Sequence, residues 1–317
     1  MSSRTKHMWY VILLIGNMLL SACGTRVADI AGGELSTRTI DIVATTGHVA
    51  DVIRNVGGDR VVVTALMGPG TDPHLYKASA NDVQSLARAD VIFYSGLHLE
   101  GRMIDIFERI GRTKPAYGIA DELPHDRLIA TGDFQGGYDP HVWFDPTLWL
   151  LVVDTVAQRL SALDVAHAAT YSANAKRYKV ELAALDAYAA QRLAAIEESR
   201  RVLITAHDAF GYFGKRYAVD VRGLQGISTA AEAGAADVQQ LAELIADRGI
   251  RAVFVESSVP KTTISAVQAA VRSRGQDVAI GGELFSDALG AADTPEGTYV
   301  GMFRTNVDTI ANALGGS

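Results

Sequence analysis

A 34-residue segment without glycine or proline, residues 165–198, constrains the fold of this chain more than any other feature. Its apolar side chains recur at spacings of three and four, which predicts one long helix with a single apolar stripe. The residues of that stripe are Tyr171, Ala175, Tyr178, Leu182, Leu185, Ala189, Leu193 and Ile196. At 1.5 Å per residue the helix would reach roughly 50 Å, enough to run the length of a two-lobed protein. We expect limited hinge motion from such a linker; the alternative is a bent or broken helix within an ordinary core.

Strand-like and helix-like segments alternate on both sides of this helix. Before it, short apolar runs stand at 39–44, 61–66, 90–94 and 116–119, with helical patterns near 47–56, 79–88 and 101–110. After it, the apolar runs are 201–205, 219–223, 252–256 and 277–281, with helical patterns near 208–217, 235–248, 260–274 and 296–314. Such alternation predicts an α/β fold of two lobes, each a parallel four-stranded sheet covered by helices. We therefore expect an N-terminal lobe at 39–164, a linker helix at 165–198 and a C-terminal lobe at 199–317.

The first residues are typical of an exported lipoprotein. Arg4, Lys6 and His7 precede an apolar run at 8–20 that is too short to span a bilayer comfortably but suits the core of a signal peptide. The run ends in Leu-Ser-Ala-Cys at 20–23, the pattern of a bacterial lipobox. We predict that residues 1–22 are removed, that Cys23 is acylated, and that residues 23–38 form a lipidated tether. A buried thiol or an uncleaved anchor helix is the alternative.

Composition limits the kinds of metal site and partner that the chain can have. Cys23 is the only cysteine in 317 residues, so the mature chain has no disulfide and no thiolate metal ligand. The net charge of -7 argues against nucleic acid as a partner. A hydrophobic content of 48% over this length is enough for the chain to be stabilised by its own core.

Four residues that can bind a metal follow predicted strands. Ligands gather at the carboxyl ends of parallel strands, so residues contributed by both lobes could converge in a crevice between them. Imidazole nitrogens suit zinc, manganese, iron, copper and nickel, and a carboxylate can complete a four- or five-coordinate site. Taken singly, a histidine in a loop is more often a solvated residue or a hydrogen-bonding partner than a metal ligand. The four candidates are His74, His141, His207 and Asp287.

Several segments resemble the zinc- and manganese-binding lipoproteins of ABC importers, the TroA-like cluster of solute-binding proteins. The resemblance covers essentially the whole mature chain, and the matching segments occur in the right order. They are GPGTDPHLYKASANDV (68–83), GLHLEG (96–101), DPHVWFDP (139–146), TAHDAFGYF (205–213), GLQGISTAAEA (223–233), VFVESSVP (253–260) and GGELFSDALG (281–290).

The resemblance implies two lobes, a connecting long helix and one buried Zn²⁺ or Mn²⁺ per chain. Position by position, the family's ligands fall on His74, His141, His207 and Asp287. It also implies an ABC permease and its ATPase as partners, a lipid-anchored position at the extracytoplasmic face of the membrane, and no catalysis. We expect a monomer. The metal stays open between zinc and manganese, because His207 replaces the Glu of many manganese or iron binders while the His-rich loop of dedicated zinc binders is absent.

Other polar residues have less direct predicted roles. Glu256 and Glu283 follow or end predicted strands and could each orient an imidazole through its free N–H, or form a salt bridge or helix cap instead. His98 and Glu100 are expected to shape the wall near the site through hydrogen bonds. His48 is expected to be structural or to support the ligands, since the family has no ligand there.

Three other functions remain possible from the sequence. A metalloenzyme could use three histidines and an open position, although no HExxH motif is present. A surface adhesin could be lipid-anchored in the same way. A chelated metal or organometallic compound could replace the bare ion.

Overall fold

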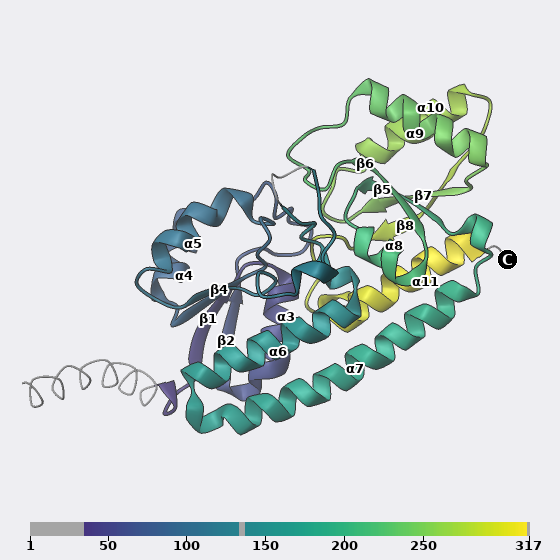
Figure 1. Cartoon of the computed structure of the whole chain (residues 1–317). Helices are drawn as coiled ribbons and strands as arrows, with labels where there is room; N and C mark the ends of the chain where they lie inside the picture. Colours follow the sequence, from purple (N-terminus) through teal and green to yellow (C-terminus); the bar gives the residue numbers. More distant parts are fainter. Residues whose placement is uncertain (1–34, 133–136, 316–317) are drawn as a thin grey trace, which may run out of the picture.

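The computed structural model describes residues 35–132 and 137–315, which form two α/β lobes with one long helix running beside both (Figure 1). The predicted signal peptide and Cys23 lie outside these residues. Within the described residues, no helix combines the length and apolarity that crossing a membrane requires.

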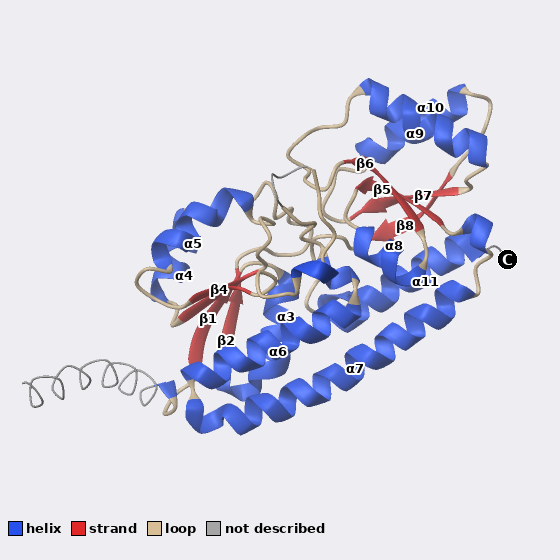
Figure 2. Ribbon diagram, viewed as in Figure 1, coloured by secondary structure: helices blue, strands red, loops and turns tan. Residues whose placement is uncertain are grey.

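The first lobe is built on a parallel four-stranded sheet in the order β2–β1–β3–β4. Its central strand β1 pairs on both sides, with Ile42 opposite Val63 and Val91. Helices pack around the sheet because βαβ crossovers place them on its faces (Figure 2). The elements are β1 (Ile40–Ala44), α3 (Gly47–Gly57), β2 (Val61–Ala65), α4 (Ala80–Arg88), β3 (Val91–Tyr94), α5 (Ile104–Ile110), β4 (Ala116–Gly118) and α6 (Pro146–Leu163).

The second lobe also contains four parallel-paired strands, but they form two ladders. β5 (Val202–His207) pairs with β6 (Asp220–Gln225), and β7 (Ala252–Glu256) pairs with β8 (Ala279–Leu284). β5 and β7 lie side by side at the centre. The covering helices are α8 (Gly211–Tyr217), α9 (Ala235–Arg248), α10 (Thr262–Ser273) and α11 (Tyr299–Gly315). The α/β prediction with parallel strands in both lobes is confirmed, whereas the continuous ladder expected in the second lobe is divided between β5 and β7.

The long helix α7 (Ala168–Ala194) packs on α6 and α3 of the first lobe and on α11 of the second. All the predicted stripe residues that lie within it are buried. The helix proper is shorter than the predicted 165–198. Residues 165–167 form a 3-10 turn, with the Asp164 carboxylate 2.9 Å from His167 Nδ1. At the other end, the Arg201 guanidinium donates to the carbonyls of Ala194, the last residue of α7, and of Ile196 just beyond it, which satisfies acceptors that the helix leaves without a partner.

A buried hydrogen bond fixes α7 against α3. Tyr178 donates its hydroxyl to the Asp51 carboxylate at 2.7 Å, and both side chains are almost fully buried. We predict that Tyr178→Phe lowers the free energy of unfolding by about 1–3 kcal/mol, because it leaves a buried carboxylate oxygen without this donor. Urea denaturation measures the change.

Tyr188→Phe is the matched control, since Tyr188 on the same helix also donates to an aspartate, Asp308, at 2.6 Å. Both aspartates keep a second donor, Asn55 for Asp51 and Arg192 for Asp308, but Asp308 is partly exposed, so water can replace the lost hydroxyl and the loss should stay below about 1 kcal/mol. Equal losses in the two variants would contradict the role assigned to the Asp51 contact.

Candidate metal centre

The four predicted residues come together between the lobes. His74 lies in the loop after β2, His141 lies just before α6, His207 is the last residue of β5, and Asp287 follows β8. One donor atom from each lies within 4.8 Å of the other three, and all four residues are buried. Among the residues that the structure describes, this is the one group of three or more His, Cys, Asp or Glu gathered so closely.

Every imidazole presents Nε2 to the centre. His74 Nε2 lies 3.3 Å from His141 Nε2, and the Asp287 oxygens lie 3.4 Å from His141 Nε2 and 3.2 Å from His207 Nε2. A tetrahedral ion with bonds of 2.0–2.1 Å separates its ligand atoms by about 3.4 Å. The spacing of the four donors therefore fits a small divalent ion.

The second imidazole is held by an aspartate two residues earlier. Asp139 Oδ1 lies 2.7 Å from His141 Nδ1 and also accepts the backbone N–H of His141 at 2.9 Å. A carboxylate on Nδ1 leaves Nε2 with its lone pair directed at the centre. The sequence reasoning missed this role of Asp139. The signal was the repeated Asp-Pro-His of 72–74 and 139–141, because Asp72 accepts the backbone N–H of His74 in the same way, at 2.8 Å.

The third imidazole is held from the neighbouring strand. Glu256, at the end of β7, places Oε2 2.5 Å from His207 Nδ1, and its Oε1 accepts the backbone N–H of His207 at 2.9 Å. Gly223 on β6 permits the close backbone packing here, since a β carbon would lie 2.4 Å from the Asp208 nitrogen. Glu283, the other carboxylate considered for this role, pairs with Lys261 at 2.6 Å on the exposed surface.

The charges of the centre are strongly coupled. Burial would raise the pKa of Asp287, but the charges and hydrogen bonds of His207 and His141 outweigh it and hold that pKa well below its usual range. Burial would lower the pKa of His141, but the carboxylates of Asp139 and Asp287 raise it to about 9. The pKa of His207 is raised in the same way against burial, by Glu256 and Asp287. For His74 burial prevails and lowers the pKa to about 3.

His48 lies beside the centre but is not one of the four. Its ring stacks on Trp143 with the centroids 4.7 Å apart, and Trp143 in turn contacts the edge of His141. Burial lowers the pKa of His48 to about 3, so the imidazole is neutral at physiological pH.

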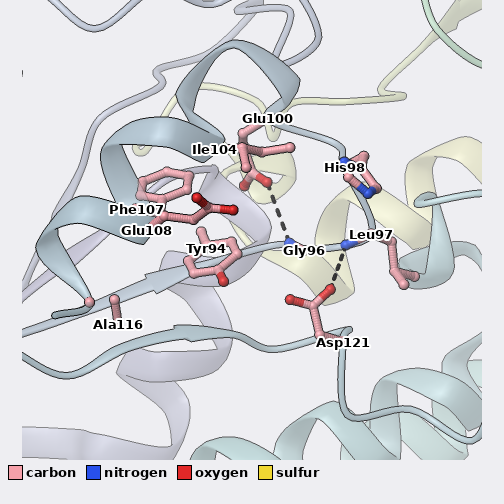
Figure 3. A pocket seen from close by; sticks show the side chains of 11 residues that line it. Tyr94, Gly96, Leu97, His98, Glu100, Ile104, Phe107, Glu108, Ala116 and Asp121 are labelled. Carbon is pink, nitrogen blue, oxygen red and sulfur yellow. Dashed lines mark hydrogen bonds between the residues drawn. The ribbon is translucent and has the colours of Figure 1, made fainter. Parts of the chain in front are cut away.

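His98 and Glu100 line a separate hollow of about 280 Å³ at the end of β3 (Figure 3). The buried Glu100 carboxylate accepts the Ser95 N–H at 2.7 Å and the Thr45 hydroxyl at 2.6 Å. These bonds hold the turn in which Leu97 and His98 have φ of 50° and 64°. Glu100 thus shapes the loop after β3, and the hydrogen bonds its carboxylate accepts do not include the four side chains of the centre.

Comparison with known proteins matches most of the chain to a single protein family. A family model described as zinc-uptake complex component A, periplasmic, matches residues 42–313. The chain is 46% identical over 302 residues to the manganese-binding lipoprotein MntA of Bacillus subtilis, covering 95% of this chain and 97% of that protein. It is 28% identical to the metal ABC transporter substrate-binding lipoprotein ScbA of Streptococcus cristatus, covering 98% and 99%. The solved structure of the periplasmic zinc binding protein TroA of Treponema pallidum matches with a TM-score of 0.86 at 44% identity, covering 88% of this chain and 100% of that one.

We predict that Glu256→Gln lowers the pKa of His207 in metal-free protein, because it removes the carboxylate nearest to Nδ1. NMR titration of the histidine ring signals measures the shift. Glu283→Gln is the matched control, since it removes an exposed carboxylate near the end of the adjacent strand and should leave the titration of His207 unchanged. A pKa of His207 that is the same in Glu256→Gln and wild type would contradict this account of the site.

Proposed function

The chain belongs to the zinc-uptake complex component A family, and from that premise we propose that it is the metal-binding, substrate-binding lipoprotein of an ABC importer. It captures a divalent transition metal ion, Zn²⁺ or Mn²⁺, between its two lobes and delivers it to a membrane permease. The observation that carries this function is the buried cluster of three Nε2 atoms and one carboxylate, contributed by His74, His141, His207 and Asp287.

The donor set suits both ions that the relatives' names give, manganese for MntA and zinc for TroA. Three nitrogens and one oxygen satisfy tetrahedral zinc. If Asp287 binds through both oxygens, the site becomes five-coordinate and more tolerant of manganese. Zinc generally outcompetes manganese at nitrogen-rich sites, so the chemistry of the ligands favours zinc and the supply of each ion in the cell decides between them.

Residues next to the four ligands orient them for the ion. Asp139 and Glu256 fix the imidazoles so that little ordering remains when the ion arrives. Asp287 brings the negative charge that offsets part of the ion's charge in a buried site. Four protein ligands close the coordination shell, leaving no open position for a reacting water, so we propose a carrier without a catalytic step.

Delivery follows from the two-lobed architecture. The lipid on Cys23 keeps the protein at the extracytoplasmic face of the membrane and raises its effective concentration at the permease and its ATPase. In this proposal the signal peptide is residues 1–22 and the tether is residues 23–38. The two lobes are residues 39–164 and 199–317, and the linker between them is residues 165–198. The protein acts as a monomer. Because the ion is buried, the permease must separate ligand-bearing loops before it can accept the metal.

We predict that His207→Ala weakens metal binding at least 100-fold, because it removes one of four ligands and leaves the Glu256 carboxylate facing the gap. Elemental analysis and competitive titration with zinc and manganese measure stoichiometry and affinity. His125→Ala is the control, since His125 is an exposed histidine of the first lobe and should keep wild-type affinity.

Asp287→Asn should also lose affinity, which guards against a fold defect specific to His207→Ala, and circular dichroism checks the fold of each variant. One ion per wild-type chain, lost in both site variants, supports the function. Folded His207→Ala with unchanged affinity would overturn it.

We predict that metal affinity increases with pH between 6 and about 9. His141 has its pKa raised to about 9 and His207 has its pKa raised in the same direction, so both imidazoles carry protons that a metal must displace. Affinity should rise roughly tenfold per pH unit for each proton released. Competitive titrations at several pH values, with calorimetry in buffers of different ionisation enthalpy, measure the proton count. An affinity that does not change over this range would contradict the assigned charges.

A further inference from the structure

The loop that carries His74 lies beside a hollow at the junction of the two lobes. The hollow has a volume of about 400 Å³, and its lining includes Asp72 and Leu75 from the first lobe and Gln225 and Thr229 from the second. Asp72 and Leu75 flank His74 in sequence. His74 is also the least buried of the four site residues, 5% exposed against 0–1% for the others. His74 is therefore the site residue with the most contact with solvent, and its sequence neighbours line the hollow.

A single carboxylate joins the two lobes at this hollow. Asp72 Oδ1 accepts the backbone N–H of His74 at 2.8 Å, and Asp72 Oδ2 accepts the hydroxyl of Thr229 at 2.6 Å. Thr229 lies 157 residues further along the chain, in the loop between β6 and α9. One side chain thus holds both a site residue and a loop of the opposite lobe.

The loop that carries Thr229 is also bonded within its own lobe, since the Gly226 carbonyl accepts the Asp208 N–H at 3.3 Å and the Ala231 carbonyl accepts an N–H of the Gln225 amide at 3.2 Å. Thr229 is 6% exposed, whereas the next three residues, 230–232, are exposed to solvent. The hydrogen bond from the buried Thr229 to Asp72 therefore joins this loop to the first lobe.

Elsewhere around the centre, the side chains that connect the loops are buried in the core. The buried Trp143 donates its Nε1–H to the carbonyl of Ser286 at 3.0 Å, which ties the His141 loop to the residue before Asp287. The buried Tyr212 donates to the Asp139 carbonyl at 2.8 Å and accepts the Ile129 N–H at 3.1 Å. Since these side chains are buried in the core, separating them exposes more apolar surface than separating Asp72 from Thr229.

We propose that Asp72 is a positioning residue whose hydrogen bond to Thr229 closes the metal centre, and that the ion enters and leaves on this side through the hollow beside His74. Breaking this bond lets the His74 loop and the 226–234 loop part, while His141, His207 and Asp287 stay in place. The inference rests on the proposed function, because it concerns the release of the ion from the same four ligands.

The test is the rate at which zinc leaves the purified protein. Zinc-loaded protein is mixed with an excess of a chromophoric chelator, at chelator concentrations where the observed rate no longer depends on chelator. Thr229→Val keeps the shape of the side chain and removes the hydroxyl, so release should become roughly tenfold faster, as expected for the loss of a hydrogen bond to a carboxylate. Thr229→Ser keeps a hydroxyl and should restore a rate close to wild type.

Thr305→Val is the matched control, because Thr305 also donates to a carboxylate, that of Glu296 at 2.9 Å, but both residues lie in the second lobe and their bond does not join the two lobes. It should release zinc at the wild-type rate. Thermal unfolding of the metal-free proteins accompanies the kinetics, and a small change in Thr229→Val shows that the effect belongs to release and not to folding.

The possible results distinguish failure of the closure role of Asp72 from failure of the proposed metal-binding function. Faster release in Thr229→Val alone supports the closure role. One zinc per chain in all proteins, with the same release rate in Thr229→Val and wild type, overturns it and leaves the proposed function standing. No stoichiometric zinc or manganese in the wild-type protein overturns the proposed function itself.

Discussion

The spacing between the two lobes is the constraint on which the rest of this structure depends. Ligand atoms for a divalent ion must lie within a few tenths of an ångström of their proper separation, and here they come from loops on both lobes. The long helix α7 sets that spacing, because its buried stripe contacts α3 and α6 in one lobe and α11 in the other. A helix packed along both lobes cannot bend without uncovering this stripe. We therefore expect the lobes to move little relative to one another, so that the movements that admit and release an ion are movements of the loops.

The candidate metal centre places one buried carboxylate among three buried imidazoles. Two of the imidazoles have an additional carboxylate on Nδ1, from Asp139 and from Glu256. These carboxylates stabilise protons on His141 and His207 when no ion is present. The same groups that orient the nitrogens for a metal thus also make protons compete with it. Affinity for the ion is a balance between the two cations, and the neutral His74 completes the set without such competition.

Periodicity and residue chemistry were enough to predict the fold class and the long helix from the sequence. The stripe of α7 was readable because it repeats over seven turns without glycine or proline, and the strand–helix alternation predicted parallel strands in both lobes. The places of His74, His141, His207 and Asp287 after strands made their convergence possible, and the resemblance to the TroA-like lipoproteins implied all four as ligands. The ends of α7 were not readable, because they depend on the side chains of Asp164 and Arg201 reaching back to the helix.

The order of the strands and the direction of individual side chains could not be predicted from the sequence. Glu256 and Glu283 both follow apolar strand residues, so their patterns alone could not separate them. The structure does so because β7 lies next to β5, which brings Glu256 to His207, while Glu283 pairs with Lys261 at the surface. The role of Asp139 was hidden for a different reason. Its carboxylate turns back on the histidine two residues later, a local arrangement that only the repeat of Asp-Pro-His hinted at.

A carrier of this kind must hold its ion tightly and still yield it. Buried side chains supply the first property, since Trp143 ties the loops of His141 and Asp287 together and Tyr212 ties the loop of His141 to α8. The second requires a weak point that does not disturb those loops. The hydroxyl-to-carboxylate bond between Thr229 and Asp72 beside the hollow meets that requirement, because breaking one hydrogen bond costs less than separating the buried aromatic side chains. Opening there removes His74 from the ion first, and an ion left with three ligands exchanges far more readily than one enclosed by four.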